Sequence, residues 1–156
     1  MFELPTTEKL TDLVASILAD ATFVFVEPVQ SDAWHQSDAL CARVVFGQGK
    51  DVELVLRAAP ALAPTLAANL LGIEPESDEA RESAADAVGE LANMLAGVLA
   101  VAVFGPETIC RISIPEVALE VGQSLVPIPE PDACRTVLLT EDGHYLSVAL
   151  RIEADA

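Results

Sequence analysis

The stretch from Ser83 to Phe104 constrains the fold most. It is rich in Ala and Leu, and its only charged residues are Asp86 and Glu90. On an α-helix that advances about 100° per residue, its larger apolar side chains gather on one side: Val88, Leu91, Met94, Leu95 and Val98. The pattern predicts one long helix whose apolar side packs against a sheet.

The segments around this helix alternate between helical and strand patterns. Helices are expected over 6–21 and from about 60 to 72, and an acidic connection over 73–81 offers Asp78 as an N-cap for the long helix. Strands are expected over 23–29, 39–46, 51–57, 108–114, 117–121, 134–140 and 144–152, with a glycine turn at 47–50 and a proline-rich loop at 127–131. This order predicts an α/β fold of the α+β type: a single domain over 1–156 with a largely antiparallel sheet, helices on one face, and two helix-plus-strand-meander halves.

Composition excludes several classes of protein. With 156 residues, of which 52% are hydrophobic, the chain can form a substantial core and is not disordered. Its net charge of −17 repels nucleic acid and anionic lipid. The longest apolar run, 91–104, is shorter than the roughly 20 residues of a spanning helix and is interrupted by Asn93. The N-terminus has no basic segment followed by an apolar one, so we expect a cytoplasmic protein.

One polar stripe runs along the long helix. Asp86, Glu90 and Asn93 fall within an arc of about 60° on the side away from the apolar residues. Gly89 and Gly97 lie on or beside the same side, and a glycine inside a helix costs about 1 kcal/mol relative to alanine. Close approach of a partner would explain that cost. A solvated helix face is the alternative that periodicity alone leaves open.

The residues of this stripe resemble a known signature. Asp86-x3-Glu90-x2-Asn93, within DAVGELANMLAG, is similar to the motif of the CheC, CheX and FliY family of chemotaxis phosphatases. That signature continues to a proline about 22 positions later, and Pro115 stands at 115 − 93 = 22. The order of elements also resembles the family's domain. The first helix lacks a second Glu-x-x-Asn, which favours a CheX-like member.

The resemblance implies hydrolysis of the phosphoaspartate on a CheY-like response-regulator receiver domain. Asn93 would position the attacking water, because an amide offers one acceptor and two donors. Glu90 would bind a lysine of the receiver. Asp86 and Gly97 would support the site, and Pro115 would be structural. The protein would carry no cofactor or metal of its own, since the receiver supplies Mg²⁺.

Two other functions stay open at this stage. The same fold could serve as a non-catalytic receiver-binding module, or as a module associated with the flagellar switch. The resemblance also implies a homodimer formed through the sheets, for which an edge strand such as 134–140 is a candidate.

Overall fold

The structure is a computed structural model that describes residues 2–30, 33–34, 37–123 and 133–153. Its helices are α1 (Thr7–Ile17), continued by the π-helical turn η1 (Leu18–Thr22), then α2 (Ala63–Leu71), α3 (Asp78–Glu82) and α4 (Ala84–Phe104). Its strands are β1 (Val26–Val29), β2 (Ser37–Gln48), β3 (Lys50–Ala58), β4 (Arg111–Ile112), β5 (Glu116–Gln123), β6 (Ala133–Thr140) and β7 (Tyr145–Ile152). The proline-rich loop predicted at 127–131 lies outside the described residues.

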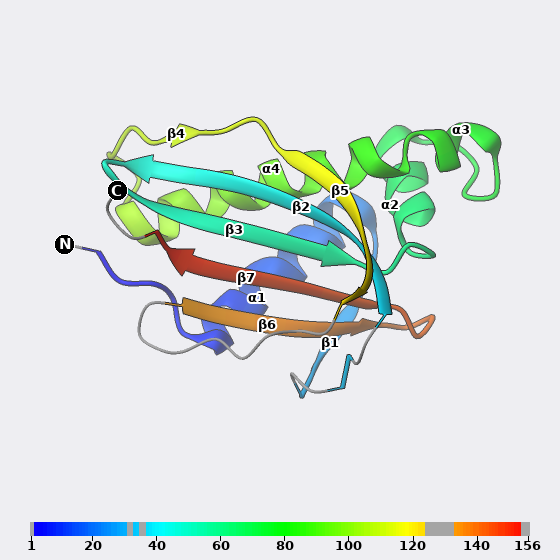
Figure 1. The fold of residues 1–156 in the computed structure, drawn as a ribbon, viewed down its shortest axis with the longest axis horizontal. Coiled ribbons are helices and arrows are strands. Elements are labelled where there is room, and N and C mark those ends of the chain that lie inside the picture. The colour runs from blue at the N-terminus through cyan, green and yellow to red at the C-terminus, as the bar shows by residue number, and fades with distance from the viewer. Residues whose placement is uncertain (1, 31–32, 35–36, 124–132, 154–156) are drawn as a thin grey trace.

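All seven strands join one sheet in the order β1-β6-β7-β3-β2-β4, with β5 also paired to β2. Every pairing is antiparallel. Helices α1, α2 and α4 lie on one face of this sheet (Figure 1). The predicted fold class, an α+β domain with a largely antiparallel sheet and helices on one face, is confirmed.

The two halves of the chain interleave within the sheet. Each half contributes a hairpin, β2–β3 or β6–β7, and the two hairpins meet where β3 pairs with β7. The strand that precedes each hairpin crosses to the other half, so that β1 pairs with β6 and β5 pairs with β2. The halves seen in the sequence are therefore locked together by shared backbone hydrogen bonds.

The long helix begins later than the sequence predicts. Ser77, not Asp78, caps α3, and its hydroxyl accepts a hydrogen bond from the Ala80 amide at 3.1 Å. The chain then turns at Ser83, where φ is −92° and ψ is 0°, and α4 starts at the next residue. Ser77 stabilises the start of α3 because its hydroxyl accepts a hydrogen bond from a first-turn N–H that has no partner within the helix. The single helix expected after Asp78 is therefore two helices.

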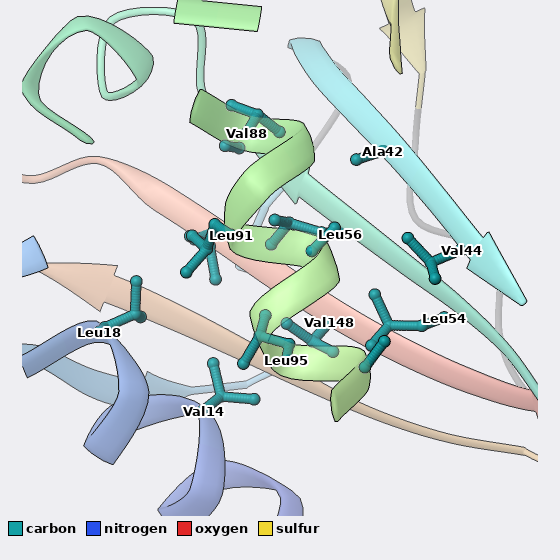
Figure 2. Close-up of a cluster of buried hydrophobic side chains, with 14 of the residues drawn as sticks. Val14, Leu18, Ala42, Val44, Leu54, Leu56, Val88, Leu91, Leu95 and Val148 are labelled. Atoms are coloured by element: carbon teal, nitrogen blue, oxygen red, sulfur yellow. The ribbon is translucent and has the colours of Figure 1, made fainter. Parts of the chain in front are cut away.

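The core lies between α4, α1 and the sheet. Val88, Leu91 and Leu95 of α4 are fully buried. Figure 2 shows them with the sheet residues Ala42, Val44, Leu54, Leu56 and Val148 and with Val14 and Leu18 from α1 and its π-helical turn. Each buried valine or leucine contributes about 1.5–3 kcal/mol relative to exposure. This packing fixes the inner side of α4 and thereby determines which residues of the helix face outward.

Two strand predictions differ from the structure. The segment predicted as a strand over 108–114 forms only the two-residue strand β4. The predicted edge strand 134–140 lies inside the sheet, because β6 pairs with β1 on one side and β7 on the other. Strand patterns reveal burial but not neighbours, so the position of β6 required the topology. Among the described strands, β1 stands at one end of the sheet and β4 and β5 at the other.

Helix α4 is also long and apolar enough to cross a membrane by length and composition alone. It has 21 residues, and its most apolar stretch of 18 has a mean hydropathy of 1.9, with 56% of that stretch buried inside the protein. A helix at the centre of a core meets the same criterion. In this structure α4 contacts the sheet and α2.

Candidate functional site

The predicted stripe lies on the outer side of α4. Asp86, Glu90 and Asn93 are all exposed, whereas Val88 and Leu91 between them are buried. Within the described part of the chain, the three polar side chains form no hydrogen bond or ion pair. They are presented on a helix whose other side is held by the core, so a carboxylate and an amide are available to a partner at fixed positions.

Gly89 has an internal reason to be glycine. It is buried, and a Cβ atom placed there would lie 3.1 Å from Cγ2 of Val117 and 3.6 Å from Cβ of Pro115. The first distance is tighter than an ordinary contact, so a side chain would displace Val117. The close approach at Gly89 is made by the chain itself, so this glycine has a reason that requires no partner.

Pro115 therefore lies directly beside the stripe. It precedes β5, and its Cβ lies 3.6 Å from where a Cβ at Gly89 would stand, next to the turn of α4 that carries Glu90. Twenty-two residues separate Pro115 from Asn93 in sequence, but the fold brings the proline against the same helix. The resemblance to the family signature identified this residue, whereas its position beside Gly89 and the participation of Val117 required the structure.

Gly97 is different. It is half-buried, and outside its own stretch of the helix no atom of the described residues lies within 4 Å of the position that its Cβ would occupy. It lines an open groove of about 590 Å³ between α4 and the N-terminal region around α1. Nothing in the sequence identified this groove, because it depends on how α1 crosses α4.

The charge around the stripe is negative. Glu79 and Glu82 on α3 are exposed, as are Asp86 and Glu90 on α4, and Arg81 pairs with Asp78. Other ion pairs lie on the strands: Arg43 with Glu53 at 3.6 Å and Arg57 with Glu120 at 3.3 Å. No group of three His, Cys, Asp or Glu side chains is arranged to hold a metal among the residues that the structure describes. The stripe itself therefore offers two carboxylates, which accept hydrogen bonds, and one amide, which both donates and accepts them.

The sequence of the chain matches the model of a known protein family. The family model described as "Chemotaxis phosphatase CheX" matches residues 40–132, more than half of the chain. The chain belongs to this family. It is a CheX-like member of the group that also includes the CheC and FliY proteins.

Solved structures show the same fold. A chemotaxis protein CheX from Desulfovibrio desulfuricans superposes with a TM-score of 0.70 at 17% identity, covering 94% of this chain and 98% of that one. The CheX–CheY–BeF3–Mg²⁺ complex from Borrelia burgdorferi gives 0.68 at 16% identity, covering 97% and 99%. FliY from Thermotoga maritima gives 0.54 at 14% identity, covering 94% and 89%. No curated protein sequence matches the chain.

Proposed function

We propose that this CheX-family protein hydrolyses the phosphoaspartate of a CheY-like response-regulator receiver domain. The observation that carries the proposal is the arrangement of Asp86, Glu90 and Asn93 on α4. All three side chains are exposed and have no partner within the described residues, and the core holds the helix from behind. The family match and the Borrelia burgdorferi CheX–CheY complex support a receiver as the partner.

Asn93 positions the attacking water. The amide is not a useful base, but its oxygen accepts a hydrogen bond from water and its nitrogen donates two. Phosphoryl transfer has a loose transition state that needs little covalent assistance, so alignment of the water with the phosphorus lowers the barrier mainly through entropy. The exposed position of Asn93 lets the amide enter a pocket on another protein.

Glu90 binds the lysine that a receiver carries near its phosphorylated aspartate. A charge-assisted bond between a carboxylate and an ammonium group is short and directional. It would set the depth and rotation at which α4 approaches. Since Glu90 and Asn93 are three residues apart on one helix, fixing the first also places the second.

The cations of the reaction come from the substrate. The stripe of this chain carries two carboxylates and no basic residue, so the charge on the transferring phosphoryl group must be neutralised by the receiver's Mg²⁺ and lysine. Such a site favours a receiver over free phosphate esters, which bring neither group. The proposed substrate also places the activity in the cytoplasm.

The remaining predicted residues act in support. Asp86 lies one turn before Glu90 on the exposed side and would bind the polar rim of the receiver's pocket. Pro115 holds the chain before β5 against α4 through its contact beside Gly89. Gly97, one turn after Asn93, adds no side chain at its own position on the helix.

The test is the decay of a phosphorylated receiver with and without the protein. Receivers are phosphorylated with a small phosphodonor, the donor is removed, and the remaining phosphoprotein is followed over time. Acceleration by a substoichiometric amount of wild-type protein supports the proposal. If every receiver tested decays at its own rate in the presence of excess protein, the phosphatase proposal fails. Binding without turnover would instead identify a non-catalytic receiver-binding module, and stable recovery with flagellar switch components a switch-associated one.

We also propose a homodimer, formed through β5 and not through β6. Within the described residues β5 pairs with β2, at the end of the sheet opposite β1. Apolar side chains are exposed on β5 and just before it: Leu119 at 56% and Ile114 at 86%. Exposed apolar edge strands favour pairing with another strand. Sedimentation at micromolar concentrations should give a dimer that Leu119→Glu converts to a monomer; a wild-type monomer would contradict the proposal.

A further inference from the structure

An open groove lies along the second half of α4, next to the proposed catalytic stripe. It has a volume of about 590 Å³ and is lined mainly by apolar side chains. The principal lining residues are Lys9 and Leu13 of α1 and Gly97, Val98, Val101 and Ala102 of α4. Val101 is 52% exposed, so an aliphatic side chain of appreciable size faces solvent here.

The groove continues the stripe. Steps of four residues from Asn93 lead to Gly97 and then to Val101, which lie within about 40° of each other and on nearly the same side of the helix. At a rise of about 1.5 Å per residue, these positions lie roughly 6 and 12 Å beyond Asn93 along the axis. Val98 and Ala102 lie further around the helix, about 140° and 180° from Asn93. A folded domain that admits Asn93 into a pocket on its surface therefore meets the groove at its near side, along Gly97 and Val101.

Gly97 indicates that the surface of another molecule approaches the helix at the groove. The two glycines of α4 weaken the helix by about the same amount, roughly 1 kcal/mol each. The cost at Gly89 is explained inside the chain by Val117 and Pro115. Nothing within 4 Å explains Gly97, and it stands where the groove meets the stripe. An external surface that approaches the helix backbone supplies the missing reason.

Two charged residues line the groove, Lys9 and Glu3, and Lys9 is the one that can receive a carboxylate. Among the described residues, the helices carry only two basic side chains, Lys9 and Arg81, and Arg81 pairs with Asp78. Lys9 is exposed and forms no ion pair in the described part of the chain. It also stands in the first turn of α1, where the helix dipole disfavours a cation. A carboxylate from a partner would compensate both effects.

We propose that this groove is a second contact for the same receiver, which inserts an apolar side chain between α1 and α4 and sets a carboxylate against Lys9. The proposal rests on the function proposed above, because α4 must dock the receiver through the stripe. A second copy of this chain is the less favoured occupant. Its contact is assigned to β5, and the groove residue Val98 lies about 180° around α4 from Gly89, which faces β5.

The experiment measures binding and turnover separately. The probe for binding is a CheY-like receiver loaded with beryllofluoride and Mg²⁺, and the same receiver in phosphorylated form is the probe for turnover. We compare Lys9→Glu and Val101→Asp with Leu71→Asp, a control at a 55% exposed leucine of α2 that does not line the groove. Because Lys9 and Val101 are exposed, neither change removes core packing.

The proposal predicts a Kd increase of about fivefold for Lys9→Glu and about tenfold for Val101→Asp, with a matching rise in KM and kcat within twofold of wild type. Leu71→Asp should leave all three values within twofold. If both groove variants bind like wild type while Asn93→Ala abolishes turnover, the groove proposal fails and the phosphatase proposal stands. If the wild type binds without turnover and the groove variants weaken binding, the groove proposal stands and the phosphatase proposal fails. Loss of self-association in the groove variants, with receiver binding unchanged, would assign the groove to a second copy and overturn the proposal.

Discussion

Helices α1 and α4 occupy similar places in the two halves of the molecule and present different outer faces. Each precedes a set of strands, lies on the helix-bearing face of the sheet, and packs on a strand that belongs to the opposite half, α1 on β6 and α4 on β2 (Figure 1). Both bury leucine and valine side chains in one core. Outward, α1 exposes Glu8 and Asp12 with no amide beside them, whereas α4 exposes Glu90 and Asn93.

This difference separates what the fold needs from what the site needs. The core specifies only the inner face of each helix, because outward side chains contribute little to packing. A carboxylate and an amide on the outer face of α4 are therefore compatible with the fold but not required by it. The same argument explains why α1 can lack them and still fold.

The largest predicted effect is on catalysis. Asn93→Ala removes the amide that aligns water and should lower the rate of receiver dephosphorylation at saturation by about 10²-fold or more. Ser16→Ala, which shortens an exposed polar side chain on α1, is the matched control and should leave the rate unchanged. Single-turnover decay of the phosphorylated receiver provides the measurement. Equal rates for the two variants would show that Asn93 on α4 has no catalytic role that Ser16 on α1 lacks.

The next effect is on affinity. Glu90→Gln removes one charge and should weaken binding of the beryllofluoride-loaded receiver by about 10-fold, the effect of losing a charge-assisted hydrogen bond of roughly 1.5 kcal/mol. The control is Asp12→Asn on α1, which also neutralises one exposed carboxylate. Titration calorimetry of both variants distinguishes a specific lysine contact from general repulsion. If both changes alter the Kd equally, net charge alone governs the association.

A smaller effect concerns stability within α4. Gly97→Ala should stabilise the protein by about 0.5–1 kcal/mol, because alanine favours the helix and meets no atom within 4 Å. Gly89→Ala should gain less or destabilise, since its Cβ would lie 3.1 Å from Val117. Urea unfolding gives both values. An equal gain in both variants would show that β5 yields to the added methyl group and that Gly89 is not fixed by packing.

The smallest effect is on thiol chemistry in β2, the strand that α4 covers. Burial, followed by the negative charge of Glu120, raises the pKa of the Cys41 thiol from 9.0 to about 11. The folded state thus favours the neutral thiol. Its contribution to the free energy of unfolding is complete below pH 9 and is lost as the pH rises toward about 11. Alkylation followed by mass spectrometry should modify half-buried Cys110 before Cys41 at pH 8–9; the reverse order would contradict this assignment.

Much of the fold follows from local patterns, and much of its arrangement does not. The apolar period of α4 and the glycine turn near 47–50 predict elements that the structure confirms, because both depend on residues close in sequence. The crossing of β1 and β5 to the opposite hairpins is a long-range property, which explains why 134–140 was assigned wrongly to an edge. Likewise, the apolar periodicity of the sequence does not reveal that Ser83 ends α3 and precedes α4.

The site divides in the same way. The spacing of Asp86, Glu90 and Asn93 places them on one side of a helix, and the structure confirms that this side is exposed. The contact of Gly89 with Pro115, and the groove beside Gly97, each join segments that are distant in sequence. Periodicity supplies no information on such contacts. Whether the stripe acts on a phosphoaspartate stays a prediction.

The structure of this protein bound to a receiver loaded with beryllofluoride and Mg²⁺ is the best test of whether Glu90 and Asn93 act inside the receiver's phosphorylation pocket. We expect α4 to enter the receiver's phosphorylation pocket and the Glu90 carboxylate to bind the receiver lysine. The Asn93 amide should lie about 2.6–3.2 Å from a water that is in line with the beryllium. A complex in which the receiver docks on α1 alone or on the strand face, with Asn93 left in solvent, would contradict this expectation.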